Sequence, residues 1–150
     1  MSVTIRQVAY TEEIVAIQAI RREVFQEEQG VPAELEFDGL DEDCWHLLAY
    51  FGKNPVGTAR IRNLDKETAK IERLAVLKSA RGSGIGRRLM ERAIDLASNN
   101  PDTSRVVINA QEYVKGLYEK LGFEVVGDRF DEAGIPHVKM VRVTRAEIDR

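Results

Sequence analysis

The residues with the clearest chemical potential are three closely spaced glycines, Gly82, Gly84 and Gly86, between a strand-like run and a helical pattern. Glycine lets the backbone adopt positive φ and approach a ligand closely. The free N–H groups and the dipole at a helix start favour a bound anion. Arg87 and Arg88 add positive charge beside the glycines. The segment therefore predicts a phosphate-binding loop.

The spacing of the glycines distinguishes three kinds of phosphate loop. A Walker loop requires Gly-x-x-x-x-Gly-Lys-Ser/Thr, and the sequence contains no such run. The dinucleotide fingerprint requires its third glycine three residues after the second, whereas here the interval is two. The sequence does contain Arg-x-x-Gly-x-Gly, formed by Arg81, Gly84 and Gly86.

A second candidate group is the phenol of Tyr118, which lies in a short helical pattern. Val114, Leu117, Tyr118 and Leu121 are spaced as one face of an amphipathic helix, which Gly122 would end. A tyrosine held close to a leaving group can donate a proton. On pattern alone, Tyr118 could equally be a core residue.

The elements that must position these groups follow from the hydrophobic patterns. Helices are expected from residue 12 to about 28, after residue 85 and around residue 118. Three early strands with tight turns predict an antiparallel meander, and a later strand–helix–strand unit predicts a parallel pair. We expect one α/β domain over residues 1–150, with a mixed central sheet flanked by helices. The expected strands are residues 2–8, 45–51, 56–61, 70–76, 106–110, 123–126 and 137–143.

Composition limits the classes of function. The chain has 150 residues, enough for one domain with a sizeable core, and a net charge of -3, which argues against a nucleic-acid partner. Cys44 is the single cysteine, so no internal disulfide can form, and no apolar run approaches the roughly 18 residues of a membrane span. We expect a cytoplasmic protein without a membrane partner. With few histidines and cysteines, no metal site is expected.

With these motifs in place, the chain resembles the GCN5-related N-acetyltransferases, the GNAT superfamily. The resemblance covers essentially the whole chain and is carried by IERLAVLKSA, the Arg-x-x-Gly-x-Gly loop and NAQEYVKGLYEKLGFE. Within the superfamily, the chain is most similar to the small bacterial group around ElaA and YjcF. That similarity is carried by REVFQEEQ at residues 22–29, by Asn109-Ala110-Gln111 and by AGIPH at residues 133–137.

The resemblance implies an acetyltransferase that moves the acetyl group of acetyl-CoA to a primary amine of a small molecule or peptide by direct attack. It implies that Tyr118 protonates the leaving thiolate and also contacts the cofactor. Asn109 would contact the pantetheine arm, with Gln111 nearby, although both could instead cap the next helix. The remaining cofactor contacts implied are Leu74, Ala75, Val76, Arg81, Gly82, Ser83, Gly84, Ile85, Gly86 and Arg87.

The attacking amine must lose a proton, because a free alkylamine has a pKa near 10. Glu72 lies two residues before Leu74, on the same strand face, and could accept that proton through a water. It could instead be an ordinary strand carboxylate or a partner of Arg60 or Arg73. His46 and His137 are weaker candidates, because a lone histidine near a strand is more often structural.

The acceptor site is the least determined part. By resemblance it would involve Phe25, Glu28, Gln29, residues 34–43 and residues 134–137. The carboxylates of Glu36, Asp38 and Asp41 would favour a cationic amine, or the segment is simply a solvated acidic loop.

Two other functions stay open at this point: a non-catalytic CoA-binding sensor and an acyl-homoserine-lactone synthase-like enzyme. A homodimer is plausible for this fold, although no residue indicates one.

Overall fold

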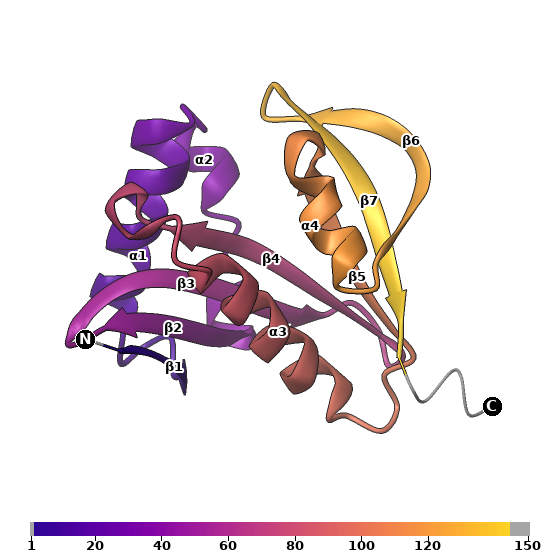
Figure 1. Ribbon diagram of the computed structural model, residues 1–150, viewed down its shortest axis with the longest axis horizontal. Coiled ribbons are helices and arrows are strands. Elements are labelled where there is room, and N and C mark those ends of the chain that lie inside the picture. Colours follow the sequence, from indigo (N-terminus) through magenta and orange to yellow (C-terminus); the bar gives the residue numbers. More distant parts are fainter. Residues whose placement is uncertain (1, 145–150) are drawn as a thin grey trace.

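The computed structural model describes residues 2–144 as a single seven-stranded sheet covered by helices (Figure 1). Along the sheet the strands are ordered β1-β2-β3-β4-β5-β7-β6. The strands are β1 (Val3–Val8), β2 (Trp45–Phe51), β3 (Asn54–Asn63), β4 (Thr68–Val76), β5 (Arg105–Gln111), β6 (Glu124–Glu132) and β7 (Ile135–Val143). The helical segments are α1 (Ile14–Arg21), η1 (Arg22–Glu28), α2 (Ala33–Glu36), η2 (Asp41–Asp43), η3 (Lys78–Ala80), α3 (Ile85–Ser98), η4 (Glu112–Val114) and α4 (Lys115–Lys120).

Opposite faces of the meander are buried by different helices, because side chains alternate along each strand. In β2, Leu47 and Ala49 belong to the core cluster that contains the apolar stripe of α3. Leu48, which lies between them, belongs to the cluster with Ile17 and Ile20 of α1. The strands of the meander are therefore apolar on both faces, as a sheet between two helical layers requires.

The parallel pair predicted from the strand–helix–strand unit is confirmed, but it is short. β4 pairs with β5 only from Thr68 to Lys70, opposite Arg105 to Val107. Beyond that point β4 stays paired with β3, while β5 pairs with β7. In Figure 1, β4 runs to the left while α4 and the β6–β7 hairpin stand on the right. The sheet is therefore split between β4 and β5 along residues 71–76.

The backbone of β4 is irregular beside this split. The pairing register between β3 and β4 shifts between Thr58 and Arg60, and Arg73 has a φ of 56°. A non-glycine residue with positive φ costs on the order of 1–3 kcal/mol and persists only where its surroundings hold it. The bulge bends β4 away from β5.

The helix expected up to residue 28 changes type before its end. After α1, residues Arg22–Glu28 form a π-helix, in which Gln29 N–H donates to the Val24 carbonyl at 3.1 Å. π-Helical turns are rare and frequently occur at functional sites.

The segment that was expected to be irregular, residues 30–43, contains the short helices α2 and η2. Within residues 2–144, no helix is long and apolar enough to cross a membrane.

Candidate active site

A cavity of about 490 Å³ lies at the split between β4 and β5. Its walls come from β4, from β5 and α4, from the end of η1, and from the β6–β7 turn. It brings together residues that are more than 100 positions apart in sequence, such as Phe25 and His137. Of the predicted site residues, the cavity lining includes Phe25, Gln29, Glu36, Glu72, Leu74, Asn109, Gln111, Tyr118 and His137.

Tyr118 lines the cavity from α4 and is 9% exposed. Its ring packs edge-on against Phe123, with the ring centroids 6.3 Å apart. Its hydroxyl makes no hydrogen bond to any other residue between 2 and 144. Burial raises the pKa of Tyr118 to about 12, so the phenol keeps its proton at neutral pH. The side chain thus presents a protonated donor that has no partner within the described chain.

Asn109 and Gln111 line the cavity from β5. The Gln111 side chain does not cap the following helix; its amide donates to the Gln29 side-chain oxygen at 3.2 Å. This contact joins the end of β5 to the residue that follows the π-helix. The capping role considered for Gln111 is therefore wrong, and the residue instead bridges two walls of the cavity.

His137 lines the cavity from β7 and is 6% exposed. Its Nδ1 lies 2.7 Å from the Ile135 carbonyl oxygen, and its Nε2 lies 3.4 Å from Glu132 Oε2. The ring also stacks against Phe130 at a centroid distance of 5.9 Å.

His46, by contrast, is buried away from the cavity, where burial lowers its pKa and its Nε2 contacts the Asp41 carbonyl oxygen at 2.8 Å. The structural reading of His46 is thus correct.

The glycine loop lies at the start of α3, outside the cavity lining. Gly82 and Gly84 have φ values of 91° and 78°, and a Cβ placed on either would meet no described atom within 4 Å. The loop is held from within: Ser83 Oγ donates to the Ala80 carbonyl at 3.0 Å, and the Ile85 side chain is buried in the core. The space beside the α-carbons of these two glycines is therefore open, which suits a close approach of phosphate oxygens.

Arg81, the first residue of the motif, is held in place by two neighbours. Its Nε donates to the Val76 carbonyl at 3.0 Å. Its two terminal nitrogens donate to both oxygens of Glu28, at 2.6 and 2.7 Å. Glu28 is the last residue of the π-helix, so this bidentate pair joins η1 to the glycine loop. Arg87, further along α3, forms only an exposed pair with Glu91 at 3.6 Å.

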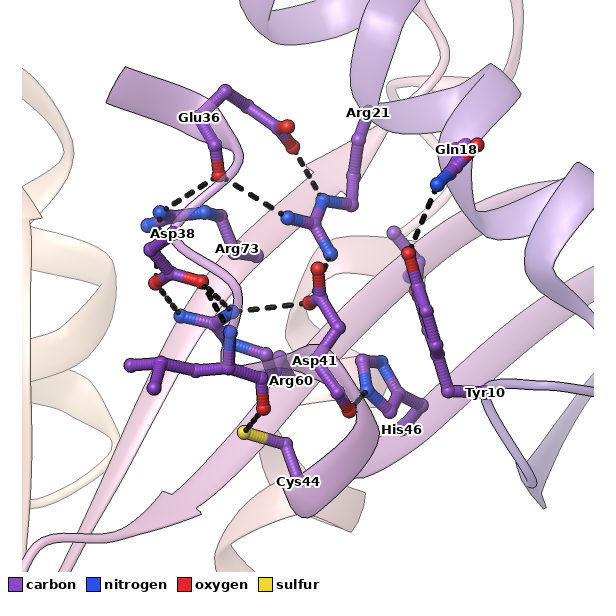
Figure 2. A network of polar contacts seen from close by, with 12 residues as sticks. Tyr10, Gln18, Arg21, Glu36, Asp38, Asp41, Cys44, His46, Arg60 and Arg73 are labelled. Carbon is purple, nitrogen blue, oxygen red and sulfur yellow. Dashed lines mark hydrogen bonds and ion pairs between the residues drawn. The ribbon is translucent and has the colours of Figure 1, made fainter. Parts of the chain in front are cut away.

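Three carboxylates of the acidic segment after the π-helix are paired with buried arginines. Arg21 contacts Glu36 and donates to Asp41 at 2.6 Å (Figure 2). Arg60 donates to Asp38 at 2.7 Å and to Asp41 at 3.0 Å. The two arginines are 1% and 0% exposed, so they compensate these carboxylates internally. The solvated-loop reading is therefore wrong for the buried Glu36 and Asp41, whose charges hold the loop in place, and the attraction of a cationic amine stays a prediction.

Glu72 belongs to the same network. It accepts hydrogen bonds from Arg60 at 2.6 Å and Arg62 at 2.7 Å, and Lys70 lies at 3.3 Å. Burial acts to raise the pKa of Glu72, but the Arg62 hydrogen bond and the charges of Arg60 and Lys70 outweigh it and lower the pKa to about 2. So acidic a carboxyl is a weak proton acceptor. This environment disfavours the base role predicted for Glu72 and supports the alternative of an arginine partner.

The remaining predicted cofactor residues have distinct positions. Leu74 lines the cavity, whereas Ala75 and Val76 are paired with Thr58 and Gly57 of β3.

Sequence reasoning missed two residues, Glu132 and Arg21. The tight β6–β7 turn brings Glu132 to His137. Arg21 follows Ile17 by four residues and so falls on the buried stripe of α1, which was the available signal. Among residues 2–144, no group of three or more His, Cys, Asp or Glu side chains could hold a metal ion.

Comparison with known proteins agrees with this arrangement. The family model described as "Acetyltransferase (GNAT) domain" matches residues 7–144. The uncharacterized N-acetyltransferase YjcF of Bacillus subtilis is 40% identical over 124 residues, which are 82% of this chain and 87% of YjcF. The crystal structure of Escherichia coli ElaA superposes with a TM-score of 0.84 at 27% identity, covering 94% of this chain and 99% of ElaA. An N-acetylglutamate synthase of Neisseria gonorrhoeae was solved with coenzyme A and N-acetyl-glutamate. It has a TM-score of 0.71 at 24% identity, covering 97% of this chain and 36% of the synthase. At that identity the similarity shows a shared fold and nothing more.

The fold is shared with solved acyltransferase structures, among them an acyl-CoA N-acyltransferase from Pseudomonas aeruginosa with a TM-score of 0.83 at 30% identity, covering 94% of this chain and 99% of that chain. The chain belongs to the GNAT acetyltransferase family. The resemblance inferred from the motifs, including that to the ElaA and YjcF group, is confirmed. Neither alternative, a lactone synthase-like enzyme or a non-catalytic sensor, is supported by these comparisons.

Proposed function

We propose that this protein transfers the acetyl group of acetyl-CoA to a primary amine by direct attack within the cavity at the β4–β5 split. The observation that carries the proposal is the position of Tyr118: a buried, protonated phenol with no hydrogen-bond partner among residues 2–144, facing the cavity where β4 and β5 no longer pair with each other.

The residues present fit acetyl-CoA in three respects. The loop of Gly82 to Gly86 offers open backbone at a helix start, suited to a pyrophosphate. The edge of β4 beyond Lys70 is not paired with β5, so it can form strand-like hydrogen bonds to the amides of a pantetheine arm. Asn109 lines the opposite side of the same split. A solved relative of the same fold, the N-acetylglutamate synthase, contains coenzyme A.

Tyr118 would act on the leaving group. When the amine attacks the thioester carbon, the C–S bond breaks and negative charge develops on sulfur. A thiol of pKa near 8.5 is a stronger acid than a phenol of pKa about 12, so Tyr118 stabilises the thiolate mainly by donating a hydrogen bond. The proton that completes the CoA thiol is then supplied by the nitrogen that has just been acylated.

Of the carboxylates that line the cavity, Glu132 is the only one without an arginine or lysine partner among the described residues. Glu36 and Glu72 are neutralised by arginines, and the Phe25, Val31 and Leu35 side chains are apolar. We therefore expect an amine carried on a small, largely uncharged body rather than a polycation. A polyamine gains nothing from carboxylates that are already paired.

The test is an acceptor screen with purified protein and acetyl-CoA. Release of the CoA thiol and the acetylated product are both measured, across monoamines, amino acids, aminosugars, polyamines and peptides. We expect turnover with at least one uncharged-body amine, with CoA and product formed in equal amounts. Tight CoA binding without turnover on any acceptor would contradict the proposal and favour a sensor.

A further inference from the structure

The strand register divides the residues of the site between two faces of the sheet. Gln111 of β5 lies opposite His137 of β7, and Asn109 lies opposite Lys139. Directly opposed residues share a face, and so do residues two apart in one strand. Asn109, Gln111 and His137 therefore lie on one face.

The other face carries Ala110 and Val138, which pack in the core cluster that contains Tyr118 of α4. Tyr118 and His137 thus reach the same cavity from opposite sides of the β5–β7 sheet. In the tetrahedral adduct of a thioester the amine nitrogen and the leaving sulfur are two separate substituents of one carbon, so the groups that handle their protons need separate positions around it. The two faces of this sheet provide that separation.

The surroundings of His137 determine which nitrogen is basic. The Ile135 carbonyl oxygen can only accept, and it lies 2.7 Å from Nδ1, so Nδ1 carries a proton. The lone pair of the neutral ring is therefore on Nε2. Glu132 Oε2 lies 3.4 Å from that nitrogen, where a carboxylate stabilises an imidazolium, and the stacked Phe130 ring limits rotation of the imidazole.

The other charged groups of the cavity lining are already engaged elsewhere. Glu36 pairs with Arg21, and Glu72 pairs with Arg60, Arg62 and Lys70. Arg73 donates to the Glu36 carbonyl at 3.1 Å and contacts Asp38. Apart from the phenols of Tyr113 and Tyr118, this leaves Glu132 and His137 as the titratable pair of the described lining.

We propose that His137 is the general base that deprotonates the acceptor ammonium, and that Glu132 is a positioning residue that stabilises the resulting imidazolium. This inference rests on the proposed acetyl transfer. His137 Nε2 takes one proton from R–NH3+, and the amine lone pair then forms the C–N bond as the C–S bond breaks. The second nitrogen-bound proton goes to the thiolate, giving R–NH–acetyl and the CoA thiol. The imidazolium then returns its proton to water.

The decisive variant is His137→Asn, because the asparagine amide can still donate to the Ile135 carbonyl while Nε2 is lost. With the best amine of the screen, we expect kcat/KM at pH 7 to fall by at least about 10²-fold, with unchanged CoA affinity. The deficit should shrink as pH rises toward the pKa of the amine, near 10, because the substrate then deprotonates without a base. Lys139→Gln, on the same strand face but outside the cavity lining, is the matched control and should retain full activity.

Glu132→Gln should lower kcat with little change in KM, because the ring that has accepted the proton loses its counter-charge, and Glu132→Asp should partly restore the wild-type kcat. A His137→Asn rate equal to wild type, or a loss equally large at every pH, would overturn the inference while leaving the proposed function intact. Failure of the wild-type protein on every amine would instead overturn the proposed function. In either case, nitrogen-15 NMR of the imidazoles tests the geometry: Nδ1–H is expected for neutral His137, and Nε2–H would contradict it.

Discussion

Arg60→Met is the substitution that most directly tests the buried network of Figure 2. Arg60 is fully buried and contacts Asp38, Asp41 and Glu72 at 2.7, 3.0 and 2.6 Å. Methionine occupies similar space but leaves three carboxylates without this cation. Removal of one partner from a buried ion pair typically costs about 3–5 kcal/mol.

The structure places the expected loss near the lower end of that range. Each carboxylate keeps one other cation: Asp41 retains Arg21, Asp38 retains Arg73, and Glu72 retains Arg62 and Lys70. We therefore expect a loss of about 3 kcal/mol in the free energy of unfolding. For a chain of this length, that corresponds to a Tm lower by roughly 6–12 °C.

The assay is urea unfolding followed by circular dichroism and by the fluorescence of Trp45, the single tryptophan. The matched control is Arg62→Met, because the Arg62 side chain is 29% exposed and, among residues 2–144, its one ion pair is with Glu72 at 2.7 Å. Exposed pairs contribute about 1 kcal/mol or less. If Arg60→Met cost no more than Arg62→Met, the claim that the acidic segment is held by buried arginines would be refuted.

Three further outcomes are expected. The pKa of Glu72 is about 2 in the folded protein, against an ordinary value of 4.5. Its ionised carboxylate should therefore contribute about 3 kcal/mol to the free energy of unfolding above pH 4.5, and this contribution is lost as the pH falls toward 2. Urea unfolding measured against pH should show this loss in wild type and not in Glu72→Gln. Glu28→Gln should release Arg81 for phosphate and tighten CoA binding roughly 2- to 5-fold by calorimetry; unchanged or weaker binding would show that the pair does not compete with the ligand. Gly84→Ala should cost about 1–2 kcal/mol of stability at its φ of 78° and weaken CoA binding, whereas Gly116→Ala, in a helix, should do neither.

The features that sequence predicted well are those determined by local spacing. Gly84 and Gly86 were predicted to lie at the start of a helix. In the structure Gly84 is the N-cap residue of α3 and Gly86 lies in its first turn. Tyr118 falls on the short apolar stripe of α4, and the strand-like apolar run of residues 45–51 coincides with β2. Each of these follows from neighbours within about seven positions.

The features that sequence could not predict depend on pairings across the fold. Arg21 and Arg60 meet carboxylates that lie 15 to 22 positions away, and no periodicity relates them. An acidic run therefore looked either solvated or available to a ligand. The same limit applies to Glu72: its sequence position left open a base or a partner of Arg60 or Arg73, and only the pairing of β3 with β4 brings Arg60 and Arg62 to its carboxylate.

The most direct test of the central claim is the acetyl-transfer rate of Tyr118→Phe with saturating acetyl-CoA and the best amine. The Tyr118 hydroxyl makes no hydrogen bond within residues 2–144, so its removal should leave the Tm and CoA affinity nearly unchanged. Loss of one donor to a developing charge typically lowers kcat by about 10²- to 10³-fold. We expect a fall of that size at unaltered stability. A wild-type rate with intact CoA binding would contradict the role of Tyr118 and, with it, the placement of the leaving sulfur in this cavity.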